Sequence, residues 1–193
     1  MNLPNTLTVL RIVLTFLIMG LLFAAGPLAK GLCLILFVLA ALTDWWDGWL
    51  ARKTRRISSL GILLDPIADK VLVIGVLLVF VQLGLVPAWM VLAIAFRELL
   101  ITGIRLYAAG RHLVIAAAKE GKHKTVSQMT AIIVALSLLW ARELLRGAAA
   151  ERFEMWMPRV ILGCMWVAVA LTVYSGAMFF WRNRTVLREA VGR

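Results

Sequence analysis

The chain has 193 residues, of which 63% are hydrophobic and 16% are charged, and its mean hydropathy is +0.93. These values lie far outside the range of soluble domains and predict an all-α integral membrane protein. The length allows one helical bundle, expected as a single membrane domain over residues 1–193, because each crossing takes about 20 apolar residues. The net charge of +11 lies mainly in predicted loops, which favours a lipid bilayer over nucleic acid as the partner.

Apolar runs bounded by charged, Pro or Gly residues predict a bundle of six transmembrane helices. The first run follows Met1 without a basic n-region or an Ala-x-Ala cleavage site, so we expect it to be retained as a helix. The charged stretch from Arg142 to Arg159 is expected to form a partly helical connection at the membrane surface. The expected spans are residues 6–25, 30–51, 59–83, 87–109, 124–142 and 158–181.

Lysine and arginine residues are concentrated on one side of these spans. They follow the second span, surround the connection after the fourth span and continue in the tail from Arg182, whereas the opposite connections hold few. The positive-inside rule therefore predicts that both termini are cytoplasmic. Because the chain has no transit peptide, we expect a multi-pass protein of a bacterial cytoplasmic (inner) membrane.

Four aspartates interrupt the otherwise apolar second and third spans. A carboxylate in hydrocarbon costs at least about 2.5 kcal/mol, so this group needs cations, water or protonation to compensate it. Asp44 and Asp47 are three residues apart, and Asp65 and Asp69 are four apart, so each pair shares one helix face. At a rise of about 1.5 Å per residue, all four lie roughly 7 to 15 Å from the cytoplasmic ends of their spans. The pattern predicts an active site in the cytoplasmic half of the membrane.

The chemistry of this site follows from its donor atoms. Clustered carboxylates without a matching set of lysines favour hard divalent cations such as Mg²⁺, Mn²⁺ or Ca²⁺. Two such ions could bridge phosphate oxygens and acidify an attacking hydroxyl, as in phosphoryl transfer. Gly48 and Ala51 would leave space on the face of the first pair, and Arg52 could form a fork to a phosphate. A divalent-cation transporter is the alternative, although its acids are expected in both halves of the bilayer.

The spacing of these residues resembles the signature of the CDP-alcohol phosphatidyltransferase family. The resemblance implies an enzyme that uses divalent metal, expected as two Mg²⁺ or Mn²⁺ ions, and that passes the phosphate-bearing group of a CDP-linked substrate to a hydroxyl, releasing CMP. It also implies a homodimer. The matching string is Asp44-x2-Asp47-Gly48-x2-Ala51-Arg52-x8-Gly61-x3-Asp65-x3-Asp69.

Roles carried over from the family follow the same positions. All four aspartates are implied metal ligands, and Asp69 is also the implied catalytic base that takes the proton of the acceptor hydroxyl. The CDP-binding residues implied are Gly48, Ala51, Arg52 and Gly61.

Three further segments resemble the bacterial phosphatidylglycerophosphate synthases of this family, and they imply transfer from CDP-diacylglycerol to sn-glycerol 3-phosphate. Phosphatidylglycerol, serine and an inositol phosphate remain alternative acceptors. The segments are Pro4 to Arg11, Arg97 to Ile101 with Arg105, and Gly121 to Thr125 with Gln128-Met129.

A basic pocket would be needed for the dianionic phosphate of this acceptor. Arg97 and Arg105 lie on one face of the fourth span, two steps of four residues apart, and could line it. Arg97 lies in mid-span, where an arginine is costly unless it is paired with a group such as Glu98 or a substrate phosphate. Lys122 and Lys124 could complete the pocket, although an ordinary positive-inside loop would also explain these two lysines.

Overall fold

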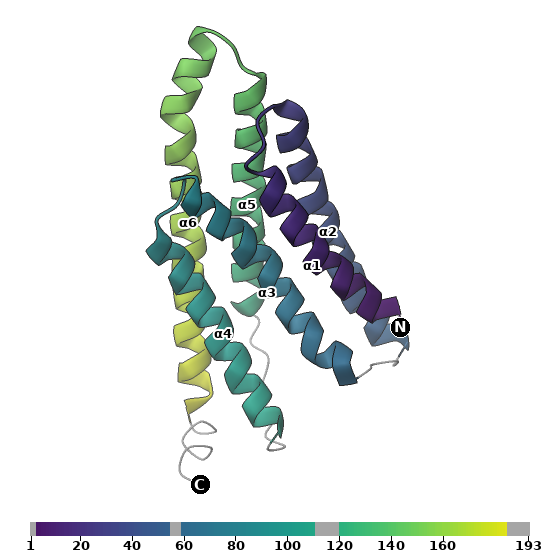
Figure 1. The fold of residues 1–193 in the computed structure, drawn as a ribbon. Coiled ribbons are helices and arrows are strands. Elements are labelled where there is room, and N and C mark those ends of the chain that lie inside the picture. Colours follow the sequence, from purple (N-terminus) through teal and green to yellow (C-terminus); the bar gives the residue numbers. More distant parts are fainter. Residues whose placement is uncertain (1–2, 55–58, 111–119, 185–193) are drawn as a thin grey trace.

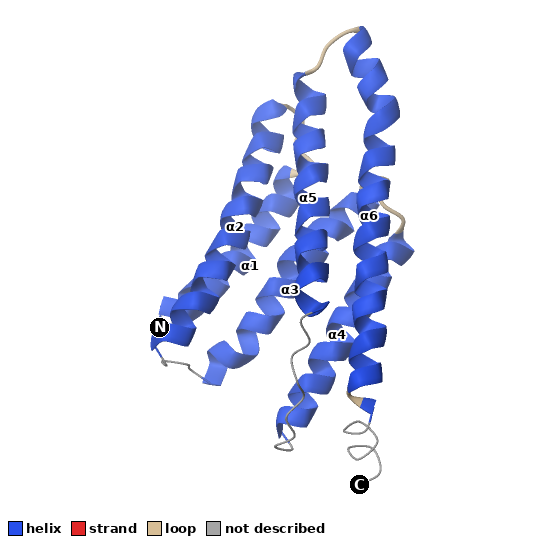
Figure 2. Cartoon of the chain, turned by 180° about the vertical axis from the view of Figure 1, so that it is seen from behind, coloured by secondary structure: helices blue, strands red, loops and turns tan. Residues whose placement is uncertain are grey.

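The computed structural model describes residues 3–54, 59–110 and 120–184, and it describes side chains within residues 9–43, 70–108 and 123–184. These parts of the chain form six α-helices and no strand (Figures 1 and 2). The all-α prediction is therefore confirmed for the described residues. The helices are α1 (Leu3–Leu21), α2 (Pro27–Thr54), α3 (Ser59–Gln82), α4 (Ala88–Gly110), α5 (Glu120–Leu144) and α6 (Ala148–Arg182).

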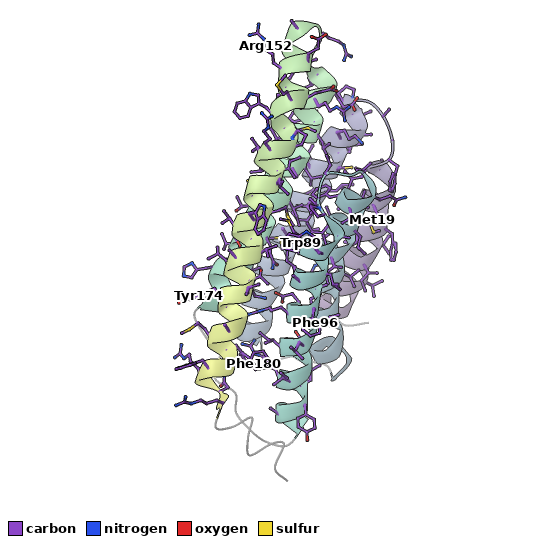
Figure 3. All side chains as sticks on the ribbon, turned by 90° about the vertical axis from the view of Figure 1, so that its left-hand side faces the viewer. Met19, Trp89, Phe96, Arg152, Tyr174 and Phe180 are labelled. Atoms are coloured by element: carbon purple, nitrogen blue, oxygen red, sulfur yellow. The ribbon has the colours of Figure 1, made fainter. Side chains whose placement is uncertain are left out.

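The last helix differs most from its predicted span. It has 35 residues, begins at Ala148 and continues through Pro158, where the sequence predicted the span to start. Gly147, with φ of 62°, separates it from α5 in a backbone conformation that suits glycine. At about 1.5 Å per residue, α6 is roughly 52 Å long. The α5–α6 hairpin accordingly extends beyond the other helices, and Arg152 lies near that end (Figures 1 and 3).

Two of the described helices are long and apolar enough to cross a membrane, over His123–Leu144 and Ala148–Arg182. Large apolar side chains are exposed on all six helices, among them Phe16, Leu28 and Leu92. In Figure 3, Tyr174 projects from the outer side of α6. An exposed apolar surface that reaches every helix is typical of contact with lipid rather than water.

The packing of the helices forms a ring in the order α1–α2–α5–α6–α4–α3, closed by contact between α3 and α1. α3 also contacts α5 across the ring. The core fills this interior because the inward faces carry large apolar residues that pack together. Its largest fully buried side chains include Phe37, Phe80, Phe179, Ile18, Leu72, Ile94, Ile132 and Leu136.

Gly75 allows α1 and α3 to approach closely. A Cβ atom at this position would lie 3.0 Å from Thr15 Cγ2 and 3.1 Å from Met19 Sδ. We expect Gly75→Val to lower the free energy of unfolding by about 1 to 3 kcal/mol, because overpacking forces these side chains or their helices apart. Thermal unfolding in detergent measures the effect. Gly163→Val is the matched control, since a Cβ at Gly163 would meet no atom of another helix within 4 Å among the described residues. Equal losses in both variants would contradict the packing argument.

Candidate active site

The four aspartates lie on two helices that follow one another in the chain. Asp44 and Asp47 belong to α2, and Asp65 and Asp69 belong to α3. The helices run antiparallel, and only residues 55–58 separate them in sequence (Figure 1). Because the backbone is helical through both halves of the motif, each pair lies on one face of its helix. Both helices also pack against α1 and α5.

The side chains of the motif lie outside those that the structure describes. Convergence of the four carboxylates on one metal site therefore stays a prediction. Their all-oxygen chemistry suits a hard divalent cation. Among the described side chains, no group of three or more His, Cys, Asp or Glu residues gathers elsewhere. The remaining motif residues fall on the same two helices, with Gly48, Ala51 and Arg52 on α2 and Gly61 on α3.

A buried carboxylate, Glu98 of α4, joins cations from three helices. Its Oε1 atom accepts hydrogen bonds from Lys124 Nζ of α5 and, at 3.2 Å, from Arg97 Nη1 of its own helix. Its Oε2 atom lies 3.7 Å from Lys70 Nζ of α3. All four side chains are at most 15% exposed. We name this group of Lys70, Arg97, Glu98 and Lys124 the Glu98 cluster. Its member Lys70 is the next residue after Asp69 along α3.

Arg97 extends the Glu98 cluster to the last helix. Its Nη2 atom donates a 2.8 Å hydrogen bond to Ser175 Oγ of α6. Gly176 makes this approach possible, because a Cβ there would lie 3.3 Å from Arg97 Cγ. The predicted pairing of Arg97 with Glu98 is confirmed, and the contact with α6 fixes the guanidinium between two helices.

The other predicted acceptor-site residues have different surroundings. Arg105 lies over the ring of Phe179, with its guanidinium carbon 5.5 Å from the ring centroid. Arg97 and Arg105 thus both contact α6, at residues one helical turn apart, as expected for residues on one face of α4. Lys124 is buried in the Glu98 cluster. Lys122 belongs to α5, but its side chain lies outside the described residues.

A second polar contact lies one turn along α5 from Lys124. Gln128 Nε2 donates a 2.9 Å hydrogen bond to Thr172 Oγ1, which in turn donates to the carbonyl oxygen of Ala168 at 2.6 Å. Both side chains are buried. This contact joins α5 to α6, as the hydrogen bond from Arg97 to Ser175 joins α4 to α6. These hydrogen bonds offset the cost of burying polar groups in an apolar bundle.

Sequence reasoning missed two features of this region. It did not predict that Glu98 would connect Lys70 with Lys124. It named Arg11 only as the end of a segment that resembles the family, whereas the structure buries this residue of α1, which is 3% exposed. The available signal was the same in each case, because a charged residue in an apolar span is costly unless it is compensated.

The fold and these residues define a helical, apolar protein with an acidic motif beside a buried cationic cluster. Comparison with known proteins identifies the family, because the profile of the CDP-alcohol phosphatidyltransferase family matches residues 1–174. The chain belongs to this family. It is therefore a CDP-alcohol phosphatidyltransferase. Members of the family generally depend on a divalent metal and are associated with membranes.

Curated relatives are similar to the chain over almost its whole length. A Bacillus subtilis protein is 38% identical over 98% of both chains, and a Rickettsia bellii protein is 34% identical over 93% of both. A Cereibacter sphaeroides protein is 30% identical over 97% of this chain and 98% of its own. Each of these relatives is named CDP-diacylglycerol–glycerol-3-phosphate 3-phosphatidyltransferase.

Proposed function

We propose that this protein transfers the phosphatidyl group of CDP-diacylglycerol to sn-glycerol 3-phosphate, giving phosphatidylglycerophosphate and CMP. Full-length similarity to relatives with this named activity supports the substrate pair. The observation that carries the acceptor assignment is the Glu98 cluster, where three cations face one carboxylate next to the aspartate motif. Such an excess of buried positive charge suits a phosphate dianion.

The chemistry requires one bond to form and one to break. An acceptor hydroxyl oxygen bonds to the phosphorus of the phosphatidyl group, the bond from that phosphorus to CMP breaks, and CMP leaves as an anion. We assign removal of the hydroxyl proton to the Asp69 carboxylate, which needs to be within hydrogen-bonding reach of that hydroxyl. Bound divalent metal, proposed as two Mg²⁺ or Mn²⁺ ions, would supply charge neutralisation on the phosphate oxygens.

The residues of the motif divide into two proposed groups. Asp44, Asp47, Asp65 and Asp69 would hold the metal, since carboxylate oxygens are its preferred ligands. The CDP moiety would lie against the small residues on the same helix faces, with Arg52 donating to its diphosphate. The small residues of this proposed site are Gly48, Ala51 and Gly61.

The acceptor phosphate would lie beside the Glu98 cluster. Arg97 and Lys124 can each donate to phosphate oxygens while they retain their contacts with Glu98, since each carries several N–H groups. Arg105 and Lys122 are proposed to complete the pocket at its cytoplasmic side. The location would bring the acceptor hydroxyl toward Asp69, because Lys70 of the cluster is the next residue along α3.

We further propose that the whole chain, residues 1–193, forms one six-span membrane domain with its active site in the cytoplasmic half. The antiparallel helices, their exposed apolar surface and the basic connections support this topology. Both ends of the described chain lie toward the same end of the bundle, as six crossings require (Figure 1). The proposed location is a bacterial cytoplasmic membrane, with a homodimer as the assembly.

An acceptor comparison tests this function. The purified protein, supplied with CDP-diacylglycerol and Mg²⁺ or Mn²⁺, is expected to release CMP with sn-glycerol 3-phosphate and not with serine, inositol phosphate or phosphatidylglycerol. The lipid product should carry the added glycerol phosphate by mass spectrometry. A preference for another acceptor would overturn the acceptor assignment while leaving the transferase chemistry in place.

A further inference from the structure

We propose that Glu98 is a positioning residue that holds Arg97 and Lys124 at the spacing needed to receive the acceptor phosphate. The inference rests on the proposed function, because it assigns a role within the acceptor site. Glu98 itself repels a phosphate and is not proposed to touch one. It would act through the two cations that it contacts.

The geometry gives Glu98 a central location that no other described carboxylate shares. One oxygen, Oε1, accepts from both Arg97 and Lys124, so the two cations are held to the same point although they belong to different helices. The other oxygen is directed to Lys70, on a third helix. Arg97 is further restrained by Ser175 of α6. Without the carboxylate, mutual repulsion would drive the ammonium and guanidinium groups apart.

Charge within the Glu98 cluster matches this role. Three cations and one carboxylate leave two positive charges in a region where each member is at most 15% exposed. A phosphate dianion would bring two negative charges. Preorganised donors bind an anion more strongly because their side-chain freedom has already been lost before binding. The Glu98 carboxylate thus lowers the free-energy cost of holding Arg97 and Lys124 in place when the acceptor is absent.

A simpler role for Glu98 is charge neutralisation alone, and a charge-balanced pair of variants separates the two roles. Glu98→Gln removes the negative charge and leaves a cluster of net charge +3. Adding Lys70→Met to this variant restores the net charge to +2 but does not restore a carboxylate between Arg97 and Lys124. Lys70→Met alone measures what the loss of this lysine contributes, so that its effect can be separated from that of Glu98→Gln.

We expect Glu98→Gln to raise the KM for sn-glycerol 3-phosphate at least about tenfold, the effect of weakening hydrogen bonds to charged groups. The KM for CDP-diacylglycerol should change less than about twofold, since that substrate does not use the cluster. The double variant should keep the raised KM for sn-glycerol 3-phosphate. Lys70→Met alone should raise it less than Glu98→Gln does, because Lys70 Nζ lies 3.7 Å from the carboxylate and does not share the oxygen that holds Arg97 and Lys124.

Recovery of the wild-type KM in the double variant would overturn positioning and establish neutralisation. An unchanged KM in Glu98→Gln would overturn the inference while leaving the proposed function standing. If Glu98→Gln does not fold, Glu98→Asp replaces it, with an increased KM expected because the shorter carboxylate cannot hold all its partners; no increase overturns the inference.

Titration calorimetry with sn-glycerol 3-phosphate and the purified proteins provides a readout without turnover. Weaker binding to Glu98→Gln than to the wild type supports positioning. A wild type that neither binds nor uses sn-glycerol 3-phosphate would overturn both the proposed function and this inference, whereas binding of equal strength to the two proteins would overturn the inference alone.

Discussion

Asp69→Asn should reduce CMP release from CDP-diacylglycerol by at least about 100-fold, the contribution of a positioned general base. The amide occupies nearly the same volume as the carboxylate but cannot take the proton of the acceptor hydroxyl. It also loses the negative charge that a divalent cation favours in a ligand. Initial rates at saturating substrates and metal measure the loss, and circular dichroism checks that the helices remain.

Glu154→Gln is the matched control for this carboxylate-to-amide change. Glu154 belongs to α6, its side chain is 55% exposed, and it forms a 3.0 Å ion pair with Arg142. Glu154 is not a residue of the candidate active site, and exposed ion pairs contribute little to stability. We therefore expect the rate of CMP release to change less than about twofold. If Asp69→Asn retained more than about a tenth of wild-type activity, Asp69 would not be the base.

Lys124→Met is expected to lower the free energy of unfolding by about 3 kcal/mol, because it removes a direct partner of a buried carboxylate. This value is at the lower end for such pairs, since Arg97 and Lys70 remain beside Glu98. Chemical unfolding in a fixed detergent, followed by helix content, measures the change. The same variant should have a higher KM for sn-glycerol 3-phosphate if the lysine donates to the acceptor.

Arg142→Met serves as the control for Lys124→Met. It also removes the cation of an ion pair between helices, but its side chain is 47% exposed. We expect a stability change below about 1 kcal/mol, as for other exposed pairs. Similar losses of stability in the two variants would contradict the view that burial makes the ion pairs of the Glu98 cluster contribute more to stability than an exposed pair does.

Hydropathy predicted the existence and order of the helices well, because long apolar runs have few alternatives in a membrane protein. It located the start of α6 poorly for a physical reason. Charges such as Glu151 and Arg152 end an apolar run, but they do not end a helix, which continues wherever its backbone hydrogen bonds can form. Pro158 likewise lies inside α6 without ending it.

Some parts of the candidate site could be predicted from the sequence, and others could not. Spacing alone placed Asp44 and Asp47 on one helix face and Asp65 and Asp69 on another, because helical periodicity is local. The Glu98 cluster depends on how α3, α4 and α5 are rotated about their axes relative to one another, which local periodicity does not specify. Adjacent residues suggested the pairing of Arg97 with Glu98, whereas the contacts of Lys70 and Lys124 required the assembled bundle.

The two lysines predicted for the acceptor pocket illustrate this limit. Lys122 and Lys124 are two residues apart, so they lie about 200° apart around α5 and cannot both face the same neighbour. Periodicity alone favours neither lysine as the one that faces the pocket. In the structure, the rotation of α5 directs Lys124 to Glu98.

The most direct test of the central claim is the stoichiometry of products from purified, metal-depleted protein in detergent. CMP and phosphatidylglycerophosphate are expected in equal amounts, only when divalent metal, CDP-diacylglycerol and sn-glycerol 3-phosphate are all present. Such turnover without an ion gradient would also exclude a requirement for cation transport. CMP release that does not depend on sn-glycerol 3-phosphate, or no release under any of these conditions, would contradict the account.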